Sequence, residues 1–104
     1  MIVTNTDSVP GHEIKEILGI AIGNTVRAKH LGKDITAGLK SMIGGEIKQY
    51  TEMLTEARKE SINRMINNAK EMNADAIVNV RFTTSATMSG AAELLAYGTA
   101  VKLS

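Results

Sequence analysis

Residues 46–82 read EIKQYTEMLTEARKESINRMINNAKEMNADAIVNVRF, and residues 94–101 read LLAYGTAV. In the first part, apolar residues recur every three or four positions, the spacing that places them on one face of an α-helix. This apolar stripe comprises Ile47, Tyr50, Leu54, Ala57, Ser61, Met65, Ala69 and Met72. We therefore predict one long helix over residues 46–73. It ends at Asn73, because asparagine tolerates the left-handed conformation in which many helices end.

Two β-strands are predicted after this helix. Residues 76–83 alternate in the manner of a strand, with Val78, Val80 and Phe82 expected on one face and Asn79 and Arg81 on the other. Residues 93–103 form the last strand, in which bulky residues alternate with alanine and glycine. The polar and small residues between them, 84–91, are typical of a loop or of the end of a long hairpin.

Two further strands are predicted before the helix, over residues 2–6 and 12–28. In the second one the alternation separates large residues from small ones rather than apolar from polar ones. The large positions are Ile14, Leu18, Ile20, Ile22 and Val26, and the small ones are Gly19, Ala21, Gly23 and Thr25. Small residues along one face of a strand let another backbone approach closely. We expect both faces of this strand to be covered, one by the helix of the same chain and one by a neighbouring subunit.

A short helix is expected between the two halves of the chain. Asp34 is a suitable N-cap, the apolar positions 35, 39, 42 and 43 share one helical face, and Gly44-Gly45 interrupts the helix. The predicted order is β-β-α-α-β-β in a single domain over residues 1–104. This order indicates the α+β class, an antiparallel sheet packed by one long helix and a short one. A helix of roughly 40 Å is longer than a compact domain of this size needs, so part of it is expected to contact another subunit.

Composition excludes several classes of function. With 12 basic and 11 acidic residues the net charge is +1, which provides no strong field for nucleic acid or an anionic membrane. The absence of cysteine excludes disulfides, thiolate nucleophiles and Cys-ligated metals. No apolar run approaches the ~20 residues of a membrane span. We therefore predict a cytoplasmic protein without nucleic-acid or membrane partners.

Several segments together resemble the YbjQ-like family, which is labelled heavy-metal-binding. They are Val26-Arg27, DITAGLKSMIGGEIKQYTEML (34–54), ARKESINRM (57–65), NADAIVNVRF (73–82) and AYGTAV (96–101). The resemblance runs over residues 2–103, and its specificity comes from the order and spacing of these pieces. It implies an α+β subunit similar to dodecin subunits, assembled into a homopentameric ring. It implies no established activity.

Few residues stand out as candidate ligands. The only histidines, His12 and His30, are separated by 18 positions without the spacing of a metal site, so they are weak candidates for a divalent metal ion. Gly44-Gly45 resembles an anion cradle only superficially, because no GK[ST] follows. The residues predicted to bind a small ligand are Arg27 and Arg81 on strands and Tyr50 and Arg58 on the long helix. An arginine on a sheet face needs a carboxylate such as that of Glu93, a ligand or a wet interface to offset its desolvation.

Three functions remain open from the sequence. The first is a non-enzymatic homo-oligomeric ring protein with a structural or small-ligand-binding role, which the two small-faced strands and the long helix favour. The second is a metal-binding protein whose ligands are shared between subunits. The third is an enzyme that acts on an anionic metabolite at subunit interfaces, a hypothesis that only the arginines and Tyr50 support.

Overall fold

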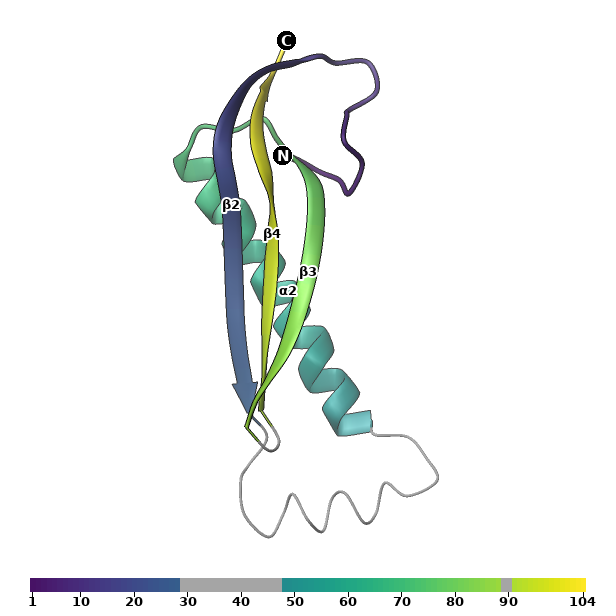
Figure 1. Ribbon diagram of the computed structural model, residues 1–104. Coiled ribbons are helices and arrows are strands. Elements are labelled where there is room, and N and C mark those ends of the chain that lie inside the picture. The colour runs from purple at the N-terminus through teal and green to yellow at the C-terminus, as the bar shows by residue number, and fades with distance from the viewer. Residues whose placement is uncertain (29–47, 89–90) are drawn as a thin grey trace, which may run out of the picture.

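The computed structural model describes residues 1–28, 48–88 and 91–104, which form one four-stranded sheet with a long helix across one face (Figure 1). The elements are β1 (Ile2–Val3), β2 (Ile14–Ala28), α2 (Lys48–Glu71), β3 (Ala76–Met88) and β4 (Ala91–Leu103). The strand order in the sheet is β1-β3-β4-β2. The predicted α+β class is confirmed.

Two details of the prediction need correction. The sheet is mixed rather than antiparallel: β4 pairs antiparallel with both β2 and β3, but β1 runs parallel to β3. The order of the described elements is β-β-α-β-β. The predicted short helix, with Asp34 and Gly44-Gly45, lies outside the described residues. The likeness to dodecin subunits stays a prediction.

The polypeptide after β1 explains the parallel pairing. Its backbone continues along the outer edge of β3, where Thr4 N donates to Ile77 O at 3.0 Å and Asn79 N donates to Thr6 O at 2.9 Å. The sequence prediction assumed an antiparallel sheet. The first strand instead pairs with β3, although β2 and α2 lie between the two strands in the sequence. Turn residues signal only pairings between neighbouring segments, so they do not reveal this one.

Helix α2 ends as predicted. Asn73 has a φ of 62°, the left-handed conformation of a helix C-terminus. The backbone N–H of Ala74 then donates to Ala69 O at 3.1 Å, which satisfies a carbonyl of the last turn. The next residues enter β3 directly. The strand then runs to Met88 and β4 starts at Ala91, so the polar segment belongs to a long hairpin rather than to a loop.

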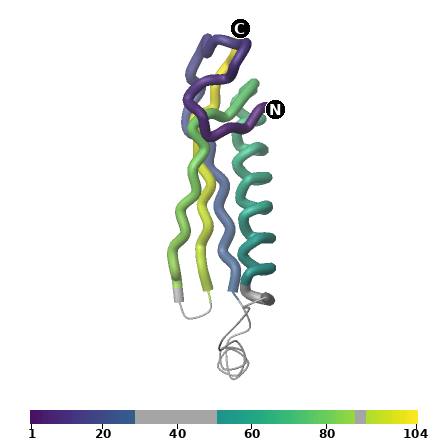
Figure 2. Tube along the Cα trace, turned by 90° about the vertical axis from the view of Figure 1, so that its right-hand side faces the viewer, coloured from purple at the N-terminus to yellow at the C-terminus, as the bar shows by residue number. Residues whose placement is uncertain are grey.

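The face of β2 that carries small residues packs against α2. The two backbones come closest at Gly23. A Cβ atom at this glycine would collide with the backbone of α2 at Ser61 O and Met65 N. Figure 2 shows α2 along one side of the sheet; among the described residues no second layer runs along the other side. The core between the two layers is built mainly from alanines around Met65 and Ile77; its buried members are Ala21, Met65, Ala69, Ile77, Ala96 and Ala100.

A buried polar contact also joins the helix to the sheet. Ser61 Oγ lies 2.9 Å from Ala57 O, 3.0 Å from Leu94 O and 3.0 Å from Thr25 Oγ1. Both hydroxyl-bearing residues are buried, and among the described residues every buried side-chain polar atom has a hydrogen-bond partner. Ser61 therefore fits the apolar stripe of the helix because its hydroxyl is satisfied there.

Candidate functional site

The sheet face opposite α2, called here the outer face, carries large apolar side chains that are open to solvent. On β2, the exposed fractions are 70% for Ile17, 65% for Ile20, 49% for Ile22 and 57% for Val26. The next strand adds Tyr97, which is also exposed. Burying an isoleucine fully stabilises a protein by about 1.5–3 kcal/mol. An apolar patch of this kind marks an interaction site.

The strand register accounts for this division of large and small residues. Opposed residues of antiparallel strands share a face. Ile22 is opposite Tyr97 on the outer face, whereas Gly23 is opposite Ala96 on the helix face. At one end of the sheet the outer face is covered by the N-terminal segment, where Val9 packs on a buried cluster of Ala76, Val78 and Val101. The open part of the outer face begins beyond this cluster.

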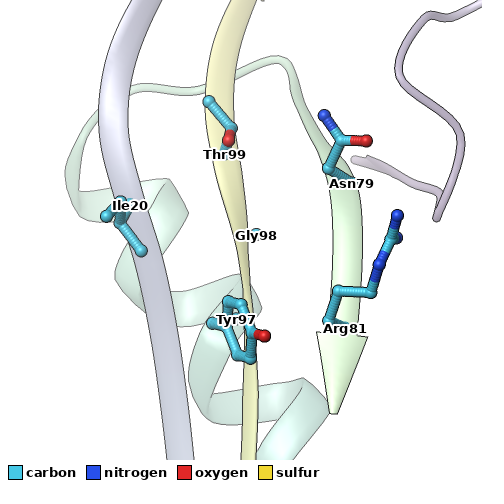
Figure 3. Close-up of a pocket in the computed structure, with 6 residues that line it drawn as sticks. All are labelled: Ile20, Asn79, Arg81, Tyr97, Gly98 and Thr99. Carbon is cyan, nitrogen blue, oxygen red and sulfur yellow. The ribbon is translucent and has the colours of Figure 1, made fainter.

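A shallow depression of about 320 Å³ lies on the open part of the outer face (Figure 3). Its lining comes from β2, β4 and β3 and comprises Ile20, Asn79, Arg81, Tyr97, Gly98 and Thr99. Of these residues only Arg81 was predicted from the sequence as a ligand-binding residue. The depression therefore combines an apolar floor with polar groups, the composition of many small-molecule sites.

A β-bulge at Asn79 places Arg81 in this depression. Asn79 has a φ of 54°, and the register with β4 shifts between Val78 and Arg81. The expected alternation of β3 is therefore wrong beyond Val78. Arg81 lies opposite Tyr97 on the outer face, and Phe82 lies opposite Ala96 on the helix face. Bulges re-aim side chains in this way and are over-represented next to functional sites.

Arg81 is held by backbone carbonyls. Its Nη1 donates to Asn5 O at 3.1 Å and to Val80 O at 3.0 Å. Among the described residues it forms no ion pair with a carboxylate, Glu93 included. Glu93 instead accepts from Asn24 Nδ2 at 3.4 Å. The guanidinium is thus oriented by the chain but its charge is not compensated by a described acidic side chain.

The other predicted ligand-binding residues do not join Arg81. Arg27 is opposite Ala92 on the helix face, whereas Arg81 is opposite Tyr97 on the outer face. The two partners are separated along β4 by roughly 16 Å at ~3.3 Å per residue. Arg58 is exposed on α2, behind the sheet. Tyr50 belongs to the first turn of α2, and its side chain lies outside the part of the chain described.

The predicted metal ligands receive no support within one copy. His12 is exposed, and its Nδ1 lies 3.3 Å from the Ser104 carbonyl oxygen. His30 lies outside the described residues. Within residues 1–28, 48–88 and 91–104 no three His, Cys, Asp or Glu side chains are grouped so that they could hold a metal ion. The described side chains therefore do not fit a heavy-metal site built by a single copy.

Comparison with known proteins places the chain in a family. A family model described as "Putative heavy-metal-binding", that of YbjQ, matches residues 1–104. The chain belongs to the YbjQ family. It is 68% identical over 103 residues to a UPF0145 protein of Archaeoglobus fulgidus, covering 99% of this chain and 95% of that one. A UPF0145 protein of Methanoculleus marisnigri is 64% identical over 103 residues, covering 99% of this chain and 96% of that one. These YbjQ relatives carry names that state no activity.

A solved structure supports the fold. The crystal structure of a protein of unknown function from Pediococcus pentosaceus, assigned to the DUF74 family, matches this YbjQ chain with a TM-score of 0.63. The match covers 100% of this chain and 98% of that one at 15% sequence identity, so it bears on the fold alone. Among the described residues, no helix is long and apolar enough to cross a membrane.

Proposed function

We propose that this YbjQ chain acts as a homo-oligomeric ring protein with a structural or small-ligand-binding role rather than as an enzyme, and that copies meet through the outer face. The observation that carries the proposal is the exposure of Ile17, Ile20, Ile22 and Val26 on one side of β2. Their removal from water upon association would stabilise the assembly by several kcal/mol, at about 25 cal/mol per Å² of apolar surface.

The composition of the core supports this proposal. More than half of the buried apolar residues among those described are alanines, namely Ala21, Ala57, Ala69, Ala76, Ala91, Ala92, Ala96 and Ala100. Each alanine buries little apolar surface, so such a core gains little stability for the number of residues that folding orders. The larger side chains of β2 lie on the opposite face, where one copy alone leaves them in water. An assembly that covers the outer face would give the chain the larger core that one copy lacks.

A ring requires two different contact surfaces on each copy. The outer face provides one, and Phe82 marks a second. Phe82 is exposed on the helix side of β3, because α2 packs over β2 and β4 and makes few contacts with β3. In a head-to-tail ring the outer face of one copy would meet the Phe82 surface of the next. The count of five copies rests on the family resemblance, and a cytoplasmic location stays a prediction.

Native mass spectrometry on untagged protein, purified without chelator or metal resin, tests the assembly. We expect a single species whose mass is five times that of the 11.1 kDa chain. A monodisperse monomer at micromolar concentration would refute the proposal.

Two variants distinguish a ring from a face-to-face dimer. In a ring, Ile20→Glu and Phe82→Glu alter the two different sides of the same contact, so each should dissociate it. In a dimer formed by two outer faces, only Ile20→Glu should do so. Mixing the two variants adds a second check. In a ring, Ile20→Glu retains the Phe82 surface and Phe82→Glu retains the outer face, so one chain of each should form a complex of two chains.

Metal binding through ligands shared between copies is the alternative that the family description favours. Titration of the assembled protein with zinc, copper and nickel tests it by calorimetry. Saturable heat that is lost in His12→Ala or His30→Ala would support a shared site. The absence of saturable heat for all three metals would remove this alternative.

A further inference from the structure

Arg81 presents an electrostatic problem for the proposed assembly. It is the one charged side chain among the described residues that line the depression, whose apolar side chains are Ile20 and Tyr97. The guanidinium lies toward the N-terminal segment, where it bonds to Asn5 O. If a second copy covers this face, the guanidinium leaves water. A charge that is removed from water without a partner carries a penalty of several kcal/mol. The site therefore calls for an anion.

The geometry of the guanidinium defines which anion fits. Its Nη1 is engaged by the carbonyl oxygens of Asn5 and Val80. Arginine has five N–H donors in a planar fork. Within the described part of the chain Nε and Nη2 make no hydrogen bond, so this edge is available for a second partner. The two carbonyl contacts fix the plane of the group in advance. A fixed planar fork of this kind matches the two oxygens of a carboxylate.

The remaining walls define the rest of the ligand. The ring of Tyr97 and the side chain of Ile20 provide apolar surface, and the Tyr97 hydroxyl is directed from β4 toward β3, where Arg81 lies (Figure 3). Asn79 and Thr99 supply polar groups at the rim. The volume, about 320 Å³, is at the small end of ligand pockets.

We propose that the depression binds a small aromatic carboxylate. Its carboxylate pairs with the Nε and Nη2 edge of Arg81, and its ring lies toward Tyr97 on the neighbouring strand. This inference rests on the proposed function, because a second copy would close the site over the ligand. One negative charge compensates the one positive charge of the site, whereas a phosphate dianion would leave an excess charge on an apolar face.

Fluorine NMR with 4-fluorobenzoate as the probe tests the proposal. We expect saturable broadening of the probe signal with wild-type protein and none with 4-fluorobenzyl alcohol, which has the ring without the charge. Arg81→Met should weaken binding roughly tenfold to a hundredfold, the value of hydrogen bonds to a charged group. Arg81→Lys should not restore it, because lysine keeps the charge but lacks the fork. The matched control is Lys59→Met, which removes an exposed cation of α2 and should leave binding unchanged.

Native mass spectra of the same samples separate this proposal from the assembly. An assembled wild-type protein that shows no saturable broadening refutes the carboxylate site and leaves the assembly intact. Binding that depends on Arg81 in a protein that remains monomeric refutes the assembly and keeps the site. Equal binding of the alcohol, equal binding by Arg81→Met, or displacement of the probe by stoichiometric inorganic phosphate would each overturn the proposed ligand class.

Discussion

The two faces of the sheet contrast in side-chain size and in exposure. On the helix face, Ala21, Gly23 and Thr25 of β2 are buried, and the backbone of α2 approaches the strand closely. On the outer face, Ile20 and Ile22 of the same strand are exposed. Side-chain volume and burial thus run opposite to the usual relation, in which the largest apolar residues fill the core.

This contrast shows that small residues can specify an interior as strictly as large ones. Glycine and alanine contribute little apolar area but allow two backbones to come into contact. The stability of this packing then depends on how closely the surfaces of α2 and β2 fit. The large residues of the outer face contribute area without constraining the fold of one copy. Substitutions on the helix face should therefore affect folding, whereas substitutions on the outer face should affect association.

The largest effect is expected for Gly23→Ala. The added Cβ would collide with Ser61 O and Met65 N, which are backbone atoms and cannot move without displacing α2. Overpacking of this kind typically costs about 1–3 kcal/mol, and a clash with the backbone places this variant at or above that limit. Urea unfolding at one fixed protein concentration measures the loss. Ser85→Ala, at an exposed position of β3, serves as control, and an equal effect of both changes would contradict the close packing.

A loss of about 2–3 kcal/mol is expected for Met65→Ala. Met65 is the largest fully buried side chain of the described residues, so its truncation leaves a cavity between helix and sheet. Met53→Ala is the matched control on the same helix, because Met53 is only partly buried. The difference in unfolding free energy between the two variants should exceed about 1 kcal/mol. Similar losses would mean that the core does not lie where the two layers meet.

A smaller effect, about 1–2 kcal/mol, is expected for Ser61→Ala, because it removes the buried hydrogen bonds of Ser61 to Thr25 and to the Leu94 carbonyl. Thr55→Ala removes a hydroxyl from the same helix, where Thr55 Oγ1 donates to Thr51 O at an exposed site. Thermal unfolding of both variants should show a lower midpoint for Ser61→Ala. A lower midpoint for Thr55→Ala would contradict the assigned roles.

The smallest effect is expected at the ion pair of Glu60 and Arg64, whose Oε1 and Nε atoms are 3.0 Å apart. Both side chains are well exposed, so Glu60→Gln should lower the unfolding free energy by less than about 0.5 kcal/mol. Arg64→Ala should cost more, because Arg64 Nη1 also donates to Asn24 O of β2 at 2.7 Å. Added salt should reduce the Glu60→Gln effect, and a large, salt-independent loss would contradict it.

Periodicity was sufficient to predict the long helix and the three long strands β2, β3 and β4. The end of the helix at Asn73 was predicted from the left-handed conformation that asparagine tolerates. It also indicated that β2 has a small face and a large face. The register of β3 could not be predicted, because the bulge at Asn79 shifts the alternation by one residue and asparagine is not a specific signal for a bulge. The parallel position of β1 was missed because the pairing joins segments more than 70 residues apart.

The candidate site was predictable only in part. Arg81 was predicted because an arginine on a strand requires a partner, but Arg27 satisfied the same criterion and lies on the other face. Tyr97, Asn79 and Thr99 join Arg81 through cross-strand register and the bulge. Neither is encoded by local spacing. The alternation of large and small residues along β2 was a usable signal, because its large residues, Ile20 among them, predicted a surface that another subunit covers.

The most direct test of the account compares assembly and folding in one variant of the outer face, Ile20→Glu combined with Ile22→Glu. Arg58→Glu, on the exposed side of α2, is the control. Sedimentation velocity and far-UV circular dichroism should be recorded on the same samples. The account predicts a monomer of 11.1 kDa with the helix content retained, while the control keeps the wild-type mass. An unchanged assembly, or a double variant that no longer folds, would contradict the claim that the large residues of β2 serve association rather than the core of one copy.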